Sequence, residues 1–249
     1  MLKILQGDNL EHLKQMTDGL FDLIYIDPPF NTGKVQKRAN EELNYCDSYD
    51  NYLDFIIPRL VEAHRVLKKT GSLFVHLDFR ECHYVKVELD KIFGRDNFMN
   101  EIIWAYDFGG RSKKKYSSKH DNIFWYVKDT KNYCFNYEEL ERIPYMAPEF
   151  CGPEKAEKGK TITDTWWHTI VHTNGKEKTG YPTQKPLGIL TRIVKVHSRE
   201  GDELLDFFAG SGSFGKAALS LKRNVTLIDQ NPEAISVINK NLETFKKKQ

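Results

Sequence analysis

LLDFFAGSGSFG, residues 204–215, is an apolar run that leads into three glycines and a helical pattern. The glycines fit the spacing G-x-G-x-x-G, in which glycine lets the backbone turn tightly and approach a ligand, while the next helix offers free N–H groups. Asp229 ends the following apolar run, about 20 residues after the first glycine, where a carboxylate can bind ribose hydroxyls. The stretch predicts a nucleoside cofactor site, and the alternative is an ordinary tight turn without a ligand.

Apolar runs and helical patterns alternate outward from this stretch. Strands are expected at 2–5, 21–27, 72–77, 100–106, 122–128, 133–137, 203–208 and 225–229, and helices at 9–16, 50–69, 81–93, 187–197, 212–221 and 232–247. The alternation predicts an α/β, Rossmann-like fold whose mostly parallel sheet has helices on both faces. Prolines and glycines break the pattern at about 138–181. We expect one domain over 1–249, with halves 1–137 and 182–249 separated by this irregular insertion.

Composition excludes several classes of protein. Hydrophobic residues make up 40% of the 249, enough for a sizeable core, and 37 Lys and Arg against 35 Asp and Glu give a net charge of +2. No apolar run approaches the roughly 20 residues of a membrane span, and the first residues do not resemble a signal peptide. The four cysteines form no C-x-x-C pair. We therefore expect a cytoplasmic protein without membrane contact, disulfides or a metal site.

The position of the glycine stretch and one acidic residue bear on the identity of the cofactor. Few residues follow Gly215, so a second nucleotide-binding half and a substrate domain would have to precede it. Asp206 stands just ahead of the glycines, where a carboxylate would repel a pyrophosphate and attract a cationic cofactor. Both facts favour S-adenosylmethionine over a nicotinamide dinucleotide, and an oxidoreductase is the alternative class.

A second motif, Asp27-Pro28-Pro29-Phe30, follows an apolar strand. Open α/β sheets bind ligands at the carboxyl ends of their strands, and the prolines stiffen the turn and leave the carbonyl near Pro28 free to accept. A carboxylate and a carbonyl can accept both protons of an exocyclic amine and aim its lone pair at a methyl group, while Phe30 stacks on the base. The alternative is a stiff turn with an exposed Asp and a core Phe.

These motifs resemble those of the DNA amino-methyltransferases, in which D-P-P-F is similar to the catalytic signature usually associated with adenine N6. The segment 206–212 looks like their S-adenosylmethionine loop, and 182–186 (PTQKP) is similar to their T-x-K-P segment. A catalytic motif that precedes the cofactor loop matches the circularly permuted β group, found largely in bacterial restriction-modification systems. The resemblance makes 1–137 the catalytic half, 182–249 the cofactor half and 138–181 a target recognition region.

The resemblance also implies roles for individual residues. Asp27 and the Pro28 carbonyl would orient the amine, Pro29 would complete the rigid turn, and Phe30, which replaces a commoner Tyr, would stack on the flipped adenine. Asp229 would bind the ribose, and Asp8 would reach the adenine ring of the cofactor. The remaining cofactor-binding residues are Asp27, Thr183, Lys185, Asp206, Phe207, Ala209, Gly210, Ser211 and Gly212.

Double-stranded DNA is the expected substrate, and a basic cluster is the expected contact to its phosphates. The cluster consists of Arg111, Lys113, Lys114, Lys115 and Lys119, and its alternative role is a solvated loop. The prediction is therefore adenine-N6 methylation of a flipped base. Cytosine-N4, RNA or protein-glutamine methylation and a non-catalytic DNA-binding role are alternatives. A homodimer and a cognate restriction endonuclease are implied partners, whereas His64 and His76 are expected in the core.

Overall fold

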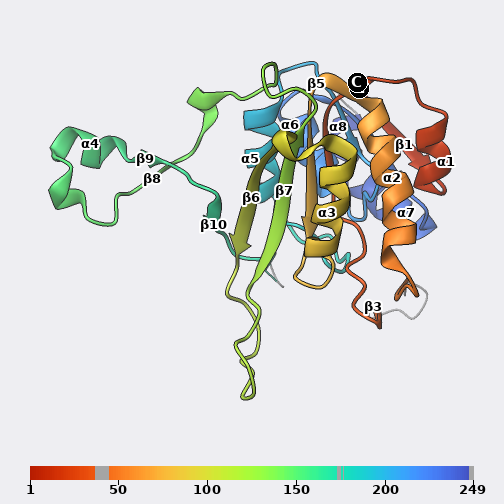
Figure 1. Ribbon diagram of the computed structural model, residues 1–249, viewed down its shortest axis with the longest axis horizontal. Helices are drawn as coiled ribbons and strands as arrows, with labels where there is room; N and C mark the ends of the chain where they lie inside the picture. The colour runs from red at the N-terminus through yellow and green to blue at the C-terminus, as the bar shows by residue number, and fades with distance from the viewer. Residues whose placement is uncertain (37–44, 173–174, 176, 247–249) are drawn as a thin grey trace.

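An eight-stranded sheet runs through the protein in the order β1-β12-β11-β2-β5-β7-β6-β10 (Figure 1). The structure is a computed structural model that describes residues 1–36, 45–172, 175 and 177–246. The strands are β1 (Leu2–Gln6), β2 (Phe21–Ile26), β5 (Leu67–Leu77), β6 (Phe98–Ala105), β7 (His120–Val127), β10 (Thr165–Trp167), β11 (Glu203–Asp206) and β12 (Asn224–Asp229). Only β7 runs antiparallel to its neighbours in this sheet, so the predicted mostly parallel arrangement is confirmed.

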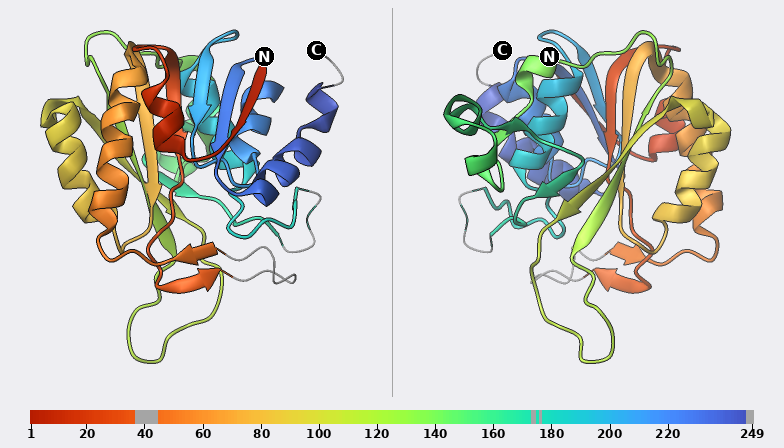
Figure 2. Two further views of the ribbon diagram at one scale, coloured as in Figure 1. Left: turned by 90° about the vertical axis from the view of Figure 1, so that its right-hand side faces the viewer. Right: turned by 60° about the vertical axis from the view of Figure 1, so that its left-hand side comes forward.

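Helices cover both faces of the sheet (Figure 2). One apolar cluster joins one face to α1 (Asn9–Lys14), α2 (Tyr52–Val66) and α3 (Cys82–Phe93). The other cluster joins the opposite face to α5 (Leu187–His197), α6 (Ser213–Ser220) and α7 (Pro232–Asn241). Alternate residues of β2 divide between the clusters, Ile24 and Ile26 in the first and Leu23 and Tyr25 in the second, as the two-residue period of a strand requires.

Smaller elements lie outside these layers. Residues Lys34–Gln36 (β3) and Tyr45–Asp47 (β4) pair as a hairpin, and Arg142–Ile143 (β8) pairs with Lys160–Thr161 (β9). The helix α4 (Pro153–Lys158) lies between β8 and β9, and α8 (Glu243–Lys246) follows α7. Among the described residues, 3₁₀ turns cover Arg95–Asn97, Tyr137–Glu139 and Pro148–Phe150.

One expected strand, 133–137, is wrong. The segment is irregular and ends in a 3₁₀ turn, because its aromatic rings pack on Trp125 instead of pairing with the sheet: Tyr133 and Phe135 lie 5.8 and 5.7 Å from it between ring centroids. Asn136 donates through its side chain to the carbonyls of Lys195 and Ser198 at the end of α5. The aromatic composition of the segment therefore indicates burial without strand pairing.

Two boundaries also differ from expectation. The helix expected to reach residue 69 ends at Val66, and β5 begins at once, because Leu67 pairs with Phe21 before the register shifts. Gly71 lies inside this strand, where a Cβ would come within 2.6 Å of Leu67 Cδ1. The helix expected at 232–247 is divided at 241 into α7 and α8, and residue 247 lies outside the described residues.

The carboxyl ends of β2, β5, β6, β10, β11 and β12 share one edge of the sheet, because these strands run in the same direction. The arm, residues 106–119, leaves this edge between β6 and β7. The lobe, residues 137–164, projects to one side instead (Figure 1). No helix among the described residues is long and apolar enough to cross a membrane.

Candidate active site

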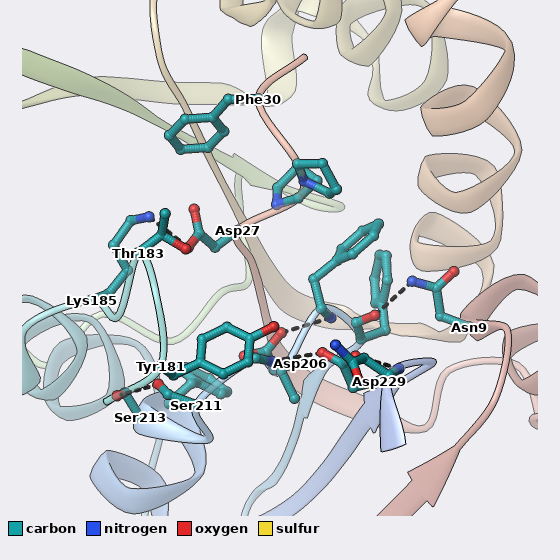
Figure 3. Close-up of a pocket in the computed structure, with 18 of the residues that line it drawn as sticks. Asn9, Asp27, Phe30, Tyr181, Thr183, Lys185, Asp206, Ser211, Ser213 and Asp229 are labelled. Atoms are coloured by element: carbon teal, nitrogen blue, oxygen red, sulfur yellow. Dashed lines mark hydrogen bonds and ion pairs between the residues drawn. The ribbon is translucent and has the colours of Figure 1, made fainter. Parts of the chain in front are cut away.

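A cavity of about 430 Å³ opens at the carboxyl ends of β2, β11 and β12. The turn that follows β2 supplies one wall, and the glycine turn that follows β11 supplies the other. Residues 181–185 close a third side (Figure 3). The two sequence motifs are thus brought together, since β11 pairs with β2, with Leu205 opposite Ile24.

Asp27 is the first residue after β2 and lies on the wall of this cavity. Its Oδ2 accepts from Lys185 Nζ at 2.6 Å, and both side chains are largely buried. Its Oδ1 is buried and has no hydrogen-bond partner among the described residues. An unpartnered buried oxygen is costly, so Asp27, which lines the cavity, holds an acceptor that a ligand donor would satisfy.

The turn after Asp27 is fixed by side chains as well as by Pro28 and Pro29. Asn31 has the unusual φ of +54°, and the buried Asp47 accepts from its N–H at 2.8 Å. The Asn31 side chain donates to Glu81 Oε1 at 2.7 Å and accepts from the Tyr49 N–H. These contacts hold Phe30 in place, whose ring lies 4.9 Å from Lys185 Nζ.

The glycine turn is built from backbone conformations that only glycine adopts easily. Gly210 and Gly212 have φ of +48° and +75°, and the Gly212 N–H donates to the Ala209 carbonyl at 2.7 Å. Asp229 accepts from the N–H groups of Gly210 at 2.8 Å and Asn231 at 2.9 Å. Asp229, the acidic residue expected at the end of β12, therefore stabilises the turn and also lines the cavity.

Carboxylates give the cavity a negative character. Burial raises the pKa of Asp206 well above its usual range, and the charges of Asp27 and Asp229 raise it further, whereas the Phe208 N–H and Lys185 oppose the shift. Burial also raises the pKa of Asp229, although the two backbone N–H groups oppose this. Four carboxyls, those of Asp27, Asp47, Asp206 and Asp229, therefore share the cavity lining with the cations of Lys185 and Arg59. The excess of carboxyls favours a cationic ligand.

Several lining residues were not identified from the sequence. Asn9 donates to the Phe207 carbonyl at 2.6 Å and accepts from Arg59 Nε at 2.6 Å. The Arg59 guanidinium lies 4.1 Å from the centre of the Phe55 ring. No motif marks these residues, because Arg59 looks like a polar interruption of an apolar helix face. Other unexpected lining residues are Tyr25, Tyr49, Tyr181, Gln184, Phe208 and Asn231.

The expected cofactor residues do not all reach the cavity. Thr183, Lys185, Asp206, Phe207, Ala209, Gly210, Ser211 and Asp229 line it together with Asp27. Asp8 does not line it, because its half-exposed carboxylate caps α1 at the Leu10 N–H and pairs with Arg59 at 3.2 Å. Gly212 also lies outside the lining and serves as the cap of α6.

The basic cluster lies on the arm, at the same sheet edge but outside the cavity lining. Arg111 pairs with Asp107 at 2.8 Å, and the Lys119 ammonium donates to the Gly110 carbonyl at 2.9 Å. In the part of the chain that the structure describes, Lys113, Lys114 and Lys115 form no ion pair. Their charges are therefore available to an external anion.

Comparison with known proteins identifies the kind of enzyme. A model of a DNA methylase family matches residues 21–240. The chain belongs to this DNA methylase family. It is 32% identical over 245 residues to the DNA adenine methyltransferase YhdJ of Escherichia coli K12, covering 94% of this chain and 80% of that protein. It is 29% identical over 242 residues to the type II methyltransferase M.HpaI of Haemophilus parainfluenzae, covering 97% and 74%.

Solved structures show the same fold at low identity. The PvuII cytosine-N4-specific DNA methyltransferase has a TM-score of 0.73 at 15% identity, covering 99% of this chain and 90% of that chain. The M1.HpyAVI complex with S-adenosylmethionine has a TM-score of 0.68 at 21% identity, covering 97% and 99%. The predicted fold, the DNA methyltransferase class of restriction-modification type and S-adenosylmethionine as cofactor are thus confirmed. The permuted motif order as a group assignment stays a prediction.

Proposed function

We propose that this methyltransferase acts on the exocyclic N6 of adenine in double-stranded DNA, with the adenine flipped out of the helix. The observation that carries the proposal is the free, buried Oδ1 of Asp27 at a cavity that also contains the glycine turn. An amine placed there meets an acceptor with no competing partner among the described residues. This is the condition for orienting a nitrogen by hydrogen bonds that strengthen during the reaction.

The lining residues fit S-adenosylmethionine. The Asp27 carboxylate and the neighbouring carboxyls of Asp206 and Asp229 place hydrogen-bond acceptors and negative charge in a largely buried site, which suits a sulfonium. Asp229 also lies where it can bind ribose hydroxyls. Asn9 and the phenyl rings of Phe55, Phe207 and Phe208 supply a mostly apolar wall for a base. When bound, the cofactor supplies an electrophilic methyl group.

The chain orients the attacking nitrogen by accepting hydrogen bonds from its N–H groups. Asp27 Oδ1 and the Pro28 carbonyl accept from the two N–H groups of the amine, which turns the nitrogen lone pair out of conjugation with the ring. Lys185 holds the Asp27 carboxylate through Oδ2, and Oδ1 keeps no partner among the described residues. Phe30 offers a ring face to the extruded base, which offsets part of the cost of flipping.

Adenine is favoured over cytosine by the D-P-P-F form of the motif and by the similarity to YhdJ, whose name specifies adenine. Cytosine N4 is the second candidate, because the PvuII enzyme, named cytosine-N4-specific, has the same fold. Both reactions use an exocyclic amine and place the same demand on Asp27.

One experiment tests the reaction and the base together. The purified protein is incubated with S-adenosylmethionine and unmethylated bacterial genomic DNA, followed by nucleoside mass spectrometry and long-read mapping of modified positions. N6-methyladenine at one short repeated sequence is expected. N4-methylcytosine would overturn the base assignment, and methylation of RNA alone would overturn the choice of nucleic acid.

We also propose how DNA is held. Lys113, Lys114 and Lys115, with Arg111 and Lys119 beside them, would contact phosphates near the target. Target recognition is assigned to 138–181, and within it Trp167, 75% exposed at the carboxyl end of β10, lies on the cavity edge of the sheet. A homodimer and a cognate restriction endonuclease complete the proposed partners.

A further inference from the structure

A row of buried polar side chains crosses four neighbouring strands beside the cavity. Tyr25 Oη on β2 lies 2.8 Å from His76 Nδ1 on β5, and His76 Nε2 lies 3.2 Å from Asp121 Oδ2 on β7. Tyr106, the first residue after β6, donates to Asp121 Oδ1 at 3.3 Å. His76 and Tyr25 are 0% and 1% exposed, and Asp121 is 7% exposed. Such a row is stable only when every member is hydrogen-bonded.

With a neutral His76 ring, the chemistry of the neighbouring groups sets the direction of these hydrogen bonds. An ionised carboxylate only accepts, so Asp121 requires a proton on His76 Nε2. In the neutral ring Nδ1 is then the acceptor, and the Tyr25 hydroxyl donates to it. The hydroxyl proton of Tyr25 is therefore directed toward His76, and the lone pairs of its oxygen meet no donor among the described residues.

Tyr25 lies close to the carboxyls of the site. It precedes Asp27 by two residues on the same strand, lines the cavity, and packs on Phe214 with ring centroids 5.3 Å apart. Burial raises the pKa of Tyr25 well above its usual range, and the charges of Asp27, Asp206 and Asp121 raise it further. Tyr25 therefore stays a neutral phenol among carboxylates.

We propose that His76, held by Asp121, is a positioning residue that orients the Tyr25 hydroxyl. In this orientation the Tyr25 oxygen, together with Asp27 and Asp206, offers hydrogen-bond acceptors to a positively charged group of the cofactor. The proposal rests on S-adenosylmethionine as cofactor and adds Tyr25 as a contact to it. A phenol turned the other way would present its proton to the positive charge and oppose binding.

Two substitutions of His76 separate its two contacts. His76→Asn places an amide oxygen near the position of Nδ1 and keeps an acceptor for Tyr25, whereas His76→Gln places its amide near Nε2 and keeps the contact to Asp121 alone. We expect S-adenosylmethionine to bind about tenfold more weakly to the Gln variant than to the Asn variant by calorimetry. Adding Tyr25→Phe to each should remove that difference, because no hydroxyl remains to be turned.

Tyr126→Phe is the matched control, because Tyr126 is another buried tyrosine of the same sheet that donates to a carboxylate, Asp90, at 2.6 Å. This control should lower the melting temperature and leave cofactor affinity unchanged. Nitrogen NMR of the ring, assigned by the signals that disappear in His76→Asn, should show a protonated Nε2 and a bare Nδ1.

A protonated Nδ1, or equal affinity of the Asn and Gln variants, would overturn the proposal. Failure of the wild-type protein to bind S-adenosylmethionine would instead overturn the proposed function. The NMR signals still report the ring in that event, so the two failures are distinguishable.

Discussion

The turns after β2 and β11 face each other across one cavity but are built differently. The turn after β2 gains its shape from two prolines and from side-chain contacts of Asn31 and Asp47, and it leaves Asp27 Oδ1 without a partner among the described residues. The turn after β11 gains its shape from positive φ at two glycines, and each Asp229 oxygen accepts from a backbone N–H. The unused acceptor thus lies on the side proposed for the substrate and the satisfied carboxylate on the side proposed for the cofactor.

This difference separates two tasks. A group that must strengthen its contacts in the transition state benefits from an unsatisfied acceptor, whereas a group that binds a cofactor uniformly benefits from a rigid, satisfied frame. Substitutions in the turn after β2 should therefore change turnover, and substitutions in the turn after β11 should change cofactor affinity.

The largest effect is expected for Asp27→Ala. Loss of the orienting carboxylate should lower kcat for DNA methylation by about 10²- to 10⁴-fold and weaken cofactor binding far less. Methyl transfer from labelled cofactor and calorimetry measure the two quantities. Asp22→Ala is the control, because Asp22 lies on the same strand and pairs with Lys68 at 2.7 Å. Full methylation by Asp27→Ala would exclude the orienting role.

Gly210→Val should act on the other side of the cavity. Gly210 has φ of +48°, and a Cβ would lie 3.0 Å from Tyr181 Cε1, so the turn must shift. We expect cofactor affinity to fall roughly 10- to 100-fold. Gly201→Val is the control, with φ of +86° and no atom within 4 Å of its Cβ. Unchanged affinity in Gly210→Val would refute the cofactor assignment.

A smaller effect is expected when Lys113, Lys114 and Lys115 are all changed to Gln. DNA affinity should weaken, while cofactor affinity stays constant. The negative slope of log affinity against log salt concentration should become shallower by about 0.9 for each phosphate that the variant no longer neutralises. Filter binding over a salt series gives the slope. The same change at the exposed Lys69, Lys131 and Lys222, which lie at the opposite edge of the sheet from the arm, is the control and should leave the slope at its wild-type value. An unchanged slope in the arm variant would show that the arm does not contact phosphates and is a solvated loop.

The smallest effect concerns pH. Because the pKa of Asp206 is raised by burial and by neighbouring carboxylates, this group ionises only as the pH rises, and the ionised form attracts a cation. Affinity for S-adenosylmethionine should therefore increase by roughly a factor of a few as the pH rises through the range in which Asp206 ionises. The same linkage makes the cofactor-free protein lose stability as Asp206 ionises. Calorimetry of Asp206→Asn should show a flatter pH dependence, and an equally steep one would assign the titration to another group.

The sequence predicted the parts of the site that depend on neighbouring residues. Asp27, Phe30 and Gly210 could be assigned because strand, turn and motif are contiguous along the chain. The pairing of Lys185 with Asp27 and the row from Tyr25 through His76 to Asp121 join residues far apart in sequence. Such pairs depend on strand order, which local patterns do not determine.

The errors in the predicted secondary structure have a related cause. The three-residue strand β10 is too short to give a periodic signal, although Trp166 buries its ring on the sheet. Conversely, the aromatic residues 133–137 imitate a strand while packing on Trp125. His76 was expected in the core and lies there, but its two nitrogens both take part in hydrogen bonds that link it to the cavity.

The strand order also bears on how the protein is made. The antiparallel group β5, β7 and β6 is local in sequence and can assemble early on the ribosome, but β1 pairs with β12, with Leu2 opposite Val225. The strand β2 likewise gains its β11 neighbour only after residue 203 has emerged. Because folding follows synthesis at about 5–20 residues per second, β1 stays unpaired for at least roughly ten seconds. The cavity, which opens at the carboxyl ends of β2, β11 and β12, therefore stays incomplete until these late strands join the sheet.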